Sequence, residues 1–413
     1  MSAAPARAAR TAALALCALC AAACGGSSLN GSASSGTGPV APANNVVSVS
    51  VSAGPSSLSS PALNTLYTTV TVCLPGTTTC QTIDNIQVDT GSYGLRLLAP
   101  VLTLSLPVST TSTGSALVEC TEFVDGYSWG PIALVDVQIS GETASSVPVQ
   151  LIGDARYPTV PADCSSGAPA SENTVASFGA NGLLGIGPFA QDCGSFCAAS
   201  IPEPAVYYGC STASTCQSTE VAINVQVQNP VTLFATDNNG SIISLPDVSD
   251  SGASDVAGSL IFGVGTESNN MLSSVTVVPI ATSGADTGYL TTVFNGSTLT
   301  MSFIDSGSNA TFFNDSSVTA CTQNGFTDFY CPTQIETLSA SFELADNSTS
   351  SQNFVVASAE TIPASSTAYP GLAGVNPASM SFDWGLPFFF GRRVATVIEG
   401  ASTADGTGPY IAF

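Results

Sequence analysis

Two short segments of the chain carry residues suited to acid–base chemistry. Val88-Asp89-Thr90-Gly91-Ser92 and Ile304-Asp305-Ser306-Gly307-Ser308 each place an aspartate at the end of an apolar run, before a hydroxyl residue and a glycine. A tight turn after a strand holds a carboxylate rigidly, and glycine lets backbone N–H groups approach it closely. Two such turns can bring two carboxylates face to face.

Two close carboxyl groups are chemically useful because they cannot both ionise. They share a proton, so one can act as a general base and the other as a general acid toward a water molecule. We therefore expect Asp89 and Asp305 to be catalytic, with no cofactor and no metal. The alternative is that both aspartates only cap turns, which is a common role of this residue.

The composition excludes most other hydrolytic devices. The 413 residues include no histidine and no lysine. Catalytic triads, Cys-His pairs, lysine Schiff bases, Walker-type phosphate loops and histidine-ligated metals are therefore ruled out. A formal net charge of −23 argues against nucleic acid as a partner.

An export signal is indicated at the start of the chain. Arg7 and Arg10 precede an apolar run from Thr11 to Ala23, which is too short to span a bilayer and has the layout of a secretory signal. The following Cys24-Gly25 completes what looks like a bacterial lipoprotein cleavage site, with Cys24 as the lipid anchor. Ordinary cleavage that leaves Cys24 as a free thiol is the alternative.

These features predict the organisation of the N-terminal part. Residues 1–24 are expected to be a lipoprotein signal peptide, and residues 25–45, which are rich in Gly, Ser and Pro, a flexible tether. We expect the mature protein to be exported and lipid-anchored to the bacterial envelope, at the outer membrane or facing the periplasm. The membrane is then one partner, through the lipid.

The cysteines predict a disulfide-bonded protein. Of the 13 cysteines, ten remain when Cys17 and Cys20 of the leader and Cys24 are removed, and ten is an even number. The expected pairs, two by proximity and the last by elimination, are Cys73 with Cys80, Cys321 with Cys331, and Cys120 with Cys164. Pairing stays open in a group of four, for which a zinc site is the alternative: Cys193, Cys197, Cys210 and Cys216.

Alternating apolar and polar residues, separated by Gly, Pro and Asn, predict a mostly β protein. Helices are expected to be short, and none is placed. The runs with the clearest pattern are Val46–Val51, Leu66–Val72, Ile83–Val88, Ile132–Ile139, Val147–Ile152 and Val221–Val227.

The order of landmarks resembles that of the pepsin-like, bilobal aspartic peptidases, in which each lobe supplies one Asp-Thr/Ser-Gly turn. Apolar glycine segments follow both aspartates, at Gly182–Phe189 and Trp384–Phe388, and in that family such a segment lies beside the turn. Gly258–Gly263 resembles the start of the second lobe's part of the shared sheet, and Pro409–Phe413 resembles the closing strand. The layout is most similar to an uncharacterised bacterial lipoprotein family.

The resemblance implies a double β-barrel with a cleft between an N-terminal lobe, residues 46–236, and a C-terminal lobe, residues 237–413. It implies a monomer that binds a peptide or an unfolded protein substrate. Six residues would support the dyad. Thr90 and Ser306 would tie the turns together, Ser92 and Ser308 would bind the outer carboxylate oxygens, and Gly91 and Gly307 would complete the turns.

A hairpin that covers the cleft is also implied. Asp125-Gly126 is a strong hairpin signal, and the neighbouring Phe123 and Tyr127 are candidates to close over a peptide. Both could equally be ordinary strand aromatics. Arg96 stands where the family usually has tryptophan, and it could lower the pKa of the dyad or pair with Asp84.

The sequence thus predicts an aspartic endopeptidase that activates water with Asp89 and Asp305. A catalytically inactive protein that binds a peptide or a protein through the same cleft is the first alternative. A glycosidase that uses the two carboxylates is the second.

Overall fold

The structure, a computed structural model, describes residues 44–166 and 170–413. The predicted signal peptide, Cys24 and residues 25–43 of the predicted tether lie outside the described residues. Within those ranges, no helix is long and apolar enough to cross a membrane.

The first half of the chain is built from strands joined by tight turns. Their bounds are β1 (Val46–Val51), β2 (Leu66–Cys73), β3 (Cys80–Asp89), β4 (Tyr93–Leu98), β5 (Ala116–Glu122), β6 (Tyr127–Ile139), β7 (Glu142–Ile152), β8 (Gly182–Ile186), β9 (Tyr207–Thr212) and β10 (Thr215–Ser218).

The second half continues in the same way. Its strands are β11 (Gly240–Ser244), β12 (Val256–Phe262), β13 (Val277–Pro279), β14 (Leu290–Phe294), β15 (Ser297–Ile304), β16 (Thr311–Phe313), β17 (Glu336–Glu343), β18 (Thr349–Val356), β19 (Ala373–Val375), β20 (Asp383–Trp384), β21 (Arg393–Val397), β22 (Ser402–Thr403), β23 (Gly406–Thr407) and β24 (Tyr410–Ala412).

Helical segments are short throughout the described ranges, as the sequence predicts. The α-helices are α1 (Ala162–Ser166), α2 (Val175–Phe178) and α3 (Ser195–Ala199). The 3-10 turns are η1 (Ala99–Val101), η2 (Ile223–Val225), η3 (Pro230–Leu233), η4 (Ala359–Thr361) and η5 (Leu386–Phe389).

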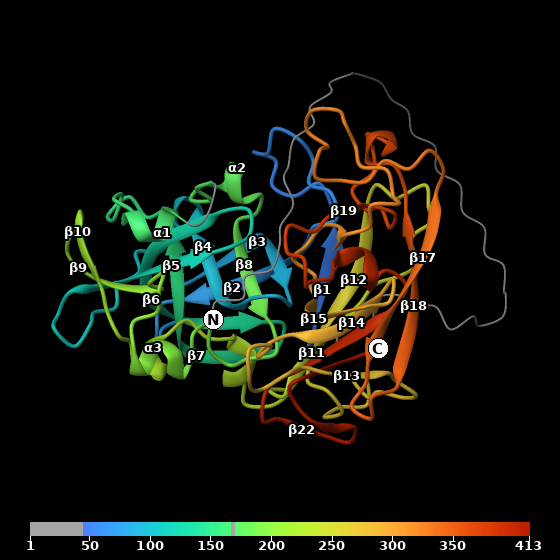
Figure 1. Ribbon diagram of the computed structural model, residues 1–413. Helices are drawn as coiled ribbons and strands as arrows, with labels where there is room; N and C mark the ends of the chain where they lie inside the picture. Colours follow the sequence, from blue (N-terminus) through green and yellow to red (C-terminus); the bar gives the residue numbers. More distant parts are fainter. Residues whose placement is uncertain (1–43, 167–169) are drawn as a thin grey trace, which may run out of the picture.

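One sheet of 15 strands joins the two halves of the chain. The first strand, β1, pairs along its full length with β12, and the sheet continues through β11, β21 and β24 to β13. Figure 1 shows blue β1 beside yellow β12 at the centre of the molecule. The expected lobe boundary, at residues 236 and 237, falls between η3 and β11.

A separate sheet of seven strands belongs to the second half, in the order β18-β17-β14-β15-β20-β16-β19. Its inner face packs aromatic rings, among them Phe313, Phe382 and Trp384, which are all buried. The molecule therefore has the mostly β, bilobal architecture of the pepsin-like fold, as expected.

The two aspartate turns are built by matching strand arrangements. β3 runs parallel to β8, with Asp89 opposite Gly185, and β4 returns antiparallel along the other edge of β8. In the second half, β15 runs parallel to β20, and β16 returns antiparallel beside it. A Cβ atom on Gly185 would lie 2.6 Å from the backbone nitrogen of Tyr93, so only glycine allows this close approach.

The predicted strand at Val221–Val227 is wrong. Residues 223–225 form the 3-10 turn η2 instead, and Ile223 is exposed although the pattern required it to be buried. The buried amide of Gln226 donates to the carbonyl of Val221, and that bond folds the segment back on itself. The other five predicted runs all form strands.

All ten cysteines in the described ranges form disulfides. The three pairs expected from the sequence are present, as Cys73–Cys80, Cys120–Cys164 and Cys321–Cys331. The open group resolves into Cys193–Cys197 and Cys210–Cys216, which leaves no thiolate there for zinc.

Candidate active site

Asp89 is held by its own turn at the end of β3. Its Oδ1 accepts a hydrogen bond of 2.7 Å from the backbone N–H of Gly91, and its Oδ2 accepts one of 2.6 Å from the Ser92 hydroxyl. The side chain is only 3% exposed. Both carboxylate oxygens are therefore fixed by neighbours within three residues.

Asp305, which directly follows β15, repeats this arrangement. Its Oδ1 accepts from the backbone N–H of Gly307 at 2.7 Å, and its Oδ2 accepts from the Ser308 hydroxyl at 2.8 Å. It is 1% exposed. The two turns thus present their carboxyl groups in the same way.

The two turns are tied together by reciprocal bonds. The Thr90 hydroxyl donates to the carbonyl of Ile304 at 3.1 Å and accepts from the backbone N–H of Ser306 at 3.0 Å. The Ser306 hydroxyl donates to the carbonyl of Val88 at 2.9 Å and accepts from the backbone N–H of Thr90 at 3.1 Å. These four buried bonds fix the distance between the turns.

The carboxyl groups of Asp89 and Asp305 are in side-chain hydrogen-bonding contact across this junction. Burial, the charge of Asp89 and that hydrogen bond raise the pKa of Asp305 well above its usual value, although Ser308 and Gly307 oppose the shift. Asp305 therefore holds a proton at a pH where an ordinary aspartate would be ionised. The pair can share that proton.

A third buried carboxyl, which the sequence analysis missed, lies next to the pair. Asp383 on β20 is fully buried, and burial followed by the charge of Asp305 raises its pKa well above the usual value. The Ser308 hydroxyl is the side-chain donor that faces it. The sequence holds one signal for Asp383: it directly precedes Trp384-Gly385, a segment that is predicted to lie beside the Asp305 turn.

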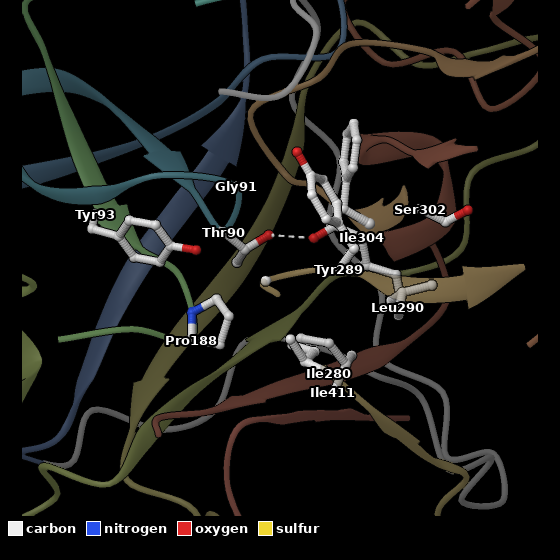
Figure 2. A pocket seen from close by; sticks show the side chains of 12 residues that line it. Thr90, Gly91, Tyr93, Pro188, Ile280, Tyr289, Leu290, Ser302, Ile304 and Ile411 are labelled. Carbon is white, nitrogen blue, oxygen red and sulfur yellow. Dashed lines mark hydrogen bonds between the residues drawn. The ribbon is translucent and has the colours of Figure 1, made fainter. Parts of the chain in front are cut away.

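A mostly apolar cavity lies against the Asp89 turn, between the two halves of the chain. Figure 2 shows the Tyr93 hydroxyl pointing toward Thr90, with Tyr289 and Leu290 on the opposite wall. Burial and then the charge of Asp89 raise the pKa of Tyr93, so its phenol is neutral. The remaining lining residues are Gly91, Pro188, Ile280, Gly288, Ser302, Phe303, Ile304 and Ile411.

The expected hairpin is present, but its aromatic side chains pack into the N-terminal half. β5 pairs with β6, and the backbone N–H of Phe123 donates to the carbonyl of Gly126, which closes the turn around Asp125. The ring of Phe123 is buried against Phe178.

The hairpin tip is also covered on its outer side. The backbone of Tyr127 bonds to Ala170 and Glu172, and a Cβ atom on Gly126 would lie 2.6 Å from the Glu172 side chain. Neither Phe123 nor Tyr127 lines the cavity in Figure 2. In this conformation, the expected covering residues do not close over a cavity beside the dyad.

Arg96 neither acts on the dyad nor pairs with Asp84. Its guanidinium is buried and lies 2.6 Å from Glu119 Oε1 and 3.3 Å from Asp192 Oδ2. Burial and the charge of Glu119 raise the pKa of Asp192 well above its usual value, against the effect of Arg96. Neither expectation for Arg96 is met, and its role in the structure is to join Glu119 and Asp192.

The fold and this site define the class of protein to which the chain is similar. The aspartic proteinase from Irpex lacteus superposes with a TM-score of 0.50 at 15% sequence identity, over 89% of this chain and 96% of that one. At this identity, the likeness shows a shared pepsin-like fold.

Family membership comes from the sequence. Residues 41–413 match the model of the family described as "Protein of unknown function (DUF3443)", and the chain belongs to that family. A search of curated proteins finds no match. The similarity to a lipoprotein family stays a prediction.

Proposed function

We propose that the protein is an aspartic endopeptidase that uses Asp89 and Asp305 to activate water. The observation that carries this proposal is the hydrogen-bonded contact of two buried carboxyl groups, each held by the same two donors of its own turn. Such symmetry is not needed for two aspartates that only cap turns.

The proposed chemistry assigns a different role to each carboxyl group. Asp305, whose pKa is raised, holds the shared proton. Asp89 accepts a proton from water. The resulting hydroxide attacks the peptide carbonyl carbon while Asp305 donates its proton to the carbonyl oxygen. Collapse of that intermediate breaks the C–N bond: the proton on Asp89 passes to the leaving amine, and a hydroxyl of the intermediate returns a proton to Asp305, which restores the shared proton.

The surroundings of the dyad favour a peptide substrate over a sugar. Glycosidase carboxyl groups stand roughly 5 Å or more apart so that a sugar or a water molecule fits between them. Carboxyl groups in direct hydrogen-bonding contact do not match that spacing. The apolar cavity beside Asp89 would hold an apolar side chain of the peptide next to the bond to be cleaved.

One contact within the chain bears on how a peptide could bind beside the dyad. The buried amide of Gln87 donates to the carbonyl of Gly307 at 3.0 Å, so that this carbonyl beside the dyad already has a partner within the chain. A peptide would have to displace this bond in order to use the Gly307 carbonyl.

Incubation with an unfolded protein substrate at acid pH tests the proposal. We expect the parent protein to cleave it, and Asp89→Asn and Asp305→Asn each to abolish cleavage while the circular dichroism spectrum is retained. A statine-type inhibitor, which mimics the intermediate, should block the parent. No cleavage with retained inhibitor binding would favour the peptide-binding alternative, and cleavage by either Asn variant would refute the dyad.

We further propose that the protein acts outside the cytosol, anchored through lipid on Cys24. The five disulfides support an oxidising compartment. Cys24→Ser should move the protein from the membrane fraction to the soluble fraction. Equal fractionation of variant and parent would contradict the anchor.

A further inference from the structure

The hydroxyl group of Tyr93 faces the cavity beside the dyad and has no use within the protein. Tyr93 begins β4, directly after the Asp89 turn, and Figure 2 shows its hydroxyl pointing toward Thr90. Its backbone carbonyl accepts a hydrogen bond from the Arg96 guanidinium, but within the described ranges its hydroxyl has no hydrogen-bond partner. This hydroxyl is therefore available to a molecule that enters the cavity.

The segment after β8 holds the ring of Tyr93 in place. The ring packs edge to face against Phe189, with ring centroids 5.6 Å apart. A Cβ atom on Gly187 would lie 2.5 Å from the Tyr93 ring, so a larger residue there would displace the ring. The position of the hydroxyl is thus set by contacts that do not involve its oxygen.

The other hydroxyl groups of the cavity wall are bonded already or point elsewhere. The Thr90 hydroxyl takes part in the bonds that tie the two turns together, and the Ser302 hydroxyl donates to one backbone carbonyl and accepts from one backbone N–H. Figure 2 shows the Tyr289 hydroxyl on the side of its ring that faces away from Pro188. The hydroxyl of Tyr93 therefore stands in mostly apolar surroundings.

A wholly apolar occupant does not match this hydroxyl. Burial and the charge of Asp89 raise the pKa of Tyr93, so its phenol keeps the proton that it can donate. An apolar side chain that fills the cavity would exclude water and leave the phenol without a partner, which costs affinity. A side chain with an apolar stem and a polar tip avoids this cost.

The charges around the cavity narrow the choice of tip. Among the described residues that line the cavity, none is charged, and the charge of Asp89 acts on Tyr93. A carboxylate tip would be repelled by Asp89, and an ammonium or guanidinium tip has no lone pair for the phenol proton. A carboxamide is neutral, and its oxygen accepts a hydrogen bond.

We propose that Tyr93 is a specificity-determining residue, which selects a peptide residue with a carboxamide tip, glutamine or asparagine, for the cavity beside the dyad. The Tyr93 hydroxyl donates to the amide oxygen of that residue, and the CH₂ stem of the residue packs against the apolar wall, which includes Leu290 and Ile304. This inference deepens the proposed function and rests on it, because the ligand is the peptide that the dyad would cleave.

Binding of matched inhibitors tests the inference without requiring cleavage. The inhibitors are statine-type peptides that differ only in one side chain next to the statine, which is methionine in one and glutamine in the other. These two side chains have similar lengths. A pair is made for each of the two positions that flank the statine. By titration calorimetry, we expect the parent protein to bind the glutamine inhibitor more tightly than the methionine inhibitor at one position.

Tyr93→Phe removes the hydroxyl and keeps the ring that packs against Phe189. We expect the preference for glutamine over methionine to fall about tenfold, which is the factor that one hydrogen bond typically gives. Tyr157→Phe is the matched control. Tyr157 is also partly buried, its hydroxyl has no hydrogen-bond partner in the described part of the chain, and it does not line the cavity. Circular dichroism checks that both variants fold.

The outcomes separate this inference from the peptidase proposal. The role of Tyr93 is overturned if the parent shows no preference for glutamine at either position, if Tyr93→Phe keeps the preference, or if neither inhibitor binds. Cleavage of an unfolded protein is measured separately. Cleavage without the preference leaves the peptidase proposal standing and refutes the role of Tyr93. A preference that falls in Tyr93→Phe, in a protein that cleaves nothing, supports the role of Tyr93 and refutes the peptidase proposal.

Discussion

Thr90 and Ser306 carry the contacts that fix the separation of the two carboxyl groups. Each hydroxyl donates to one backbone carbonyl of the opposite turn and accepts from one backbone N–H of that turn. The bonds are buried, so a lost partner leaves donors and acceptors that water cannot reach. The geometry of the dyad therefore depends on two hydroxyl groups that do no chemistry themselves.

Replacing Thr90 tests whether the geometry of the dyad depends on its hydroxyl group. Thr90→Val keeps the shape of the side chain but leaves the Ile304 carbonyl and the Ser306 N–H without their partner, so we expect a loss of about 2–4 kcal/mol in the free energy of unfolding. Activity on peptide should fall at least about tenfold, because 1.4 kcal/mol in positioning is one factor of ten.

The matched control is Thr90→Ser, which keeps the hydroxyl, as Ser306 does at the equivalent position. Urea unfolding and cleavage assays on both variants decide the question. Equal effects of valine and serine would contradict the hydroxyl's role.

The sequence pointed to the two aspartates of the dyad and to the residues that support them. It did not point to the other residues that lie around them. Asp89 and Asp305 stand out because each belongs to a repeated local motif. Asp383 does not, because the chain has 29 acidic residues and only the pairing of β20 with β15 brings this one to Ser308. Side-chain contacts across long sequence separations are not encoded in any local pattern.

At the scale of elements, one asparagine ties the loop between β1 and β2 to the second half of the chain. Asn64 is fully buried, and its amide donates at 2.8 Å to the carbonyls of both Asn309 and Tyr369. It also accepts from the Tyr369 N–H at 2.7 Å. Figure 1 shows the blue loop after β1 reaching between the two halves.

Asn64 also adopts a left-handed backbone conformation, with φ of 49°, which asparagine and glycine tolerate best. Asn64→Gly keeps that conformation and removes only the side-chain hydrogen bonds. We expect this change to lower the free energy of unfolding by about 3 kcal/mol. Asn64→Ala adds backbone strain, so it should cost about 1 kcal/mol more. Chemical unfolding of both variants measures this. Equal stability of parent and glycine variant would mean that the amide bonds contribute nothing.

The strands β4, β5 and the segment after β8 are joined by the buried pairs of Arg96 with Glu119 and Asp192. Arg96→Met removes the cation and leaves two carboxyl groups buried together, so we expect the free energy of unfolding to fall by about 3–5 kcal/mol. Arg156→Met breaks a half-exposed pair with Asp154 and should cost less than about 1 kcal/mol. Urea unfolding compares the two. Similar losses for both variants would contradict the difference in burial.

Strand prediction succeeded where the alternation of side chains follows a sheet with one buried face, as in β1 and the second half of β6. It failed at Val221–Val227, where the same alternation is present. There the side-chain amide of Gln226 donates to backbone carbonyls, and a local 3-10 turn forms in place of hydrogen bonds to a neighbouring strand. Pairing of β1 with β12, more than 200 residues away, could be expected only from the family resemblance.

For the whole molecule, the absence of histidine makes the pH dependence of stability unusually simple to interpret. Without histidine, the carboxyl groups with raised pKa values are the side chains that titrate above the usual carboxyl range, and they include Asp192, Asp305 and Asp383. Each binds its proton more tightly in the folded state than in the unfolded state. Their contribution to stability is therefore complete below the unfolded pKa of about 4 and is lost as the pH rises toward the folded value.

We accordingly expect the melting temperature to fall as the pH is raised from about 4 to about 7. Asp305→Asn and Asp383→Asn should each flatten the curve, because the amide does not titrate. Scanning calorimetry at constant ionic strength provides the measurement. A melting temperature that rises over this range would contradict the protonated state assigned to the buried carboxyl groups.

The pH profile of peptide cleavage tests the central claim most directly. With one proton shared by Asp89 and Asp305, kcat/KM should be bell-shaped in acid: it falls at low pH when the pair holds two protons, and it falls at higher pH when the pair loses its shared proton. Asp89→Asn and Asp305→Asn should show no cleavage at any pH. Cleavage that persists in either variant, or a parent without cleavage between about pH 3 and 7, would contradict the account.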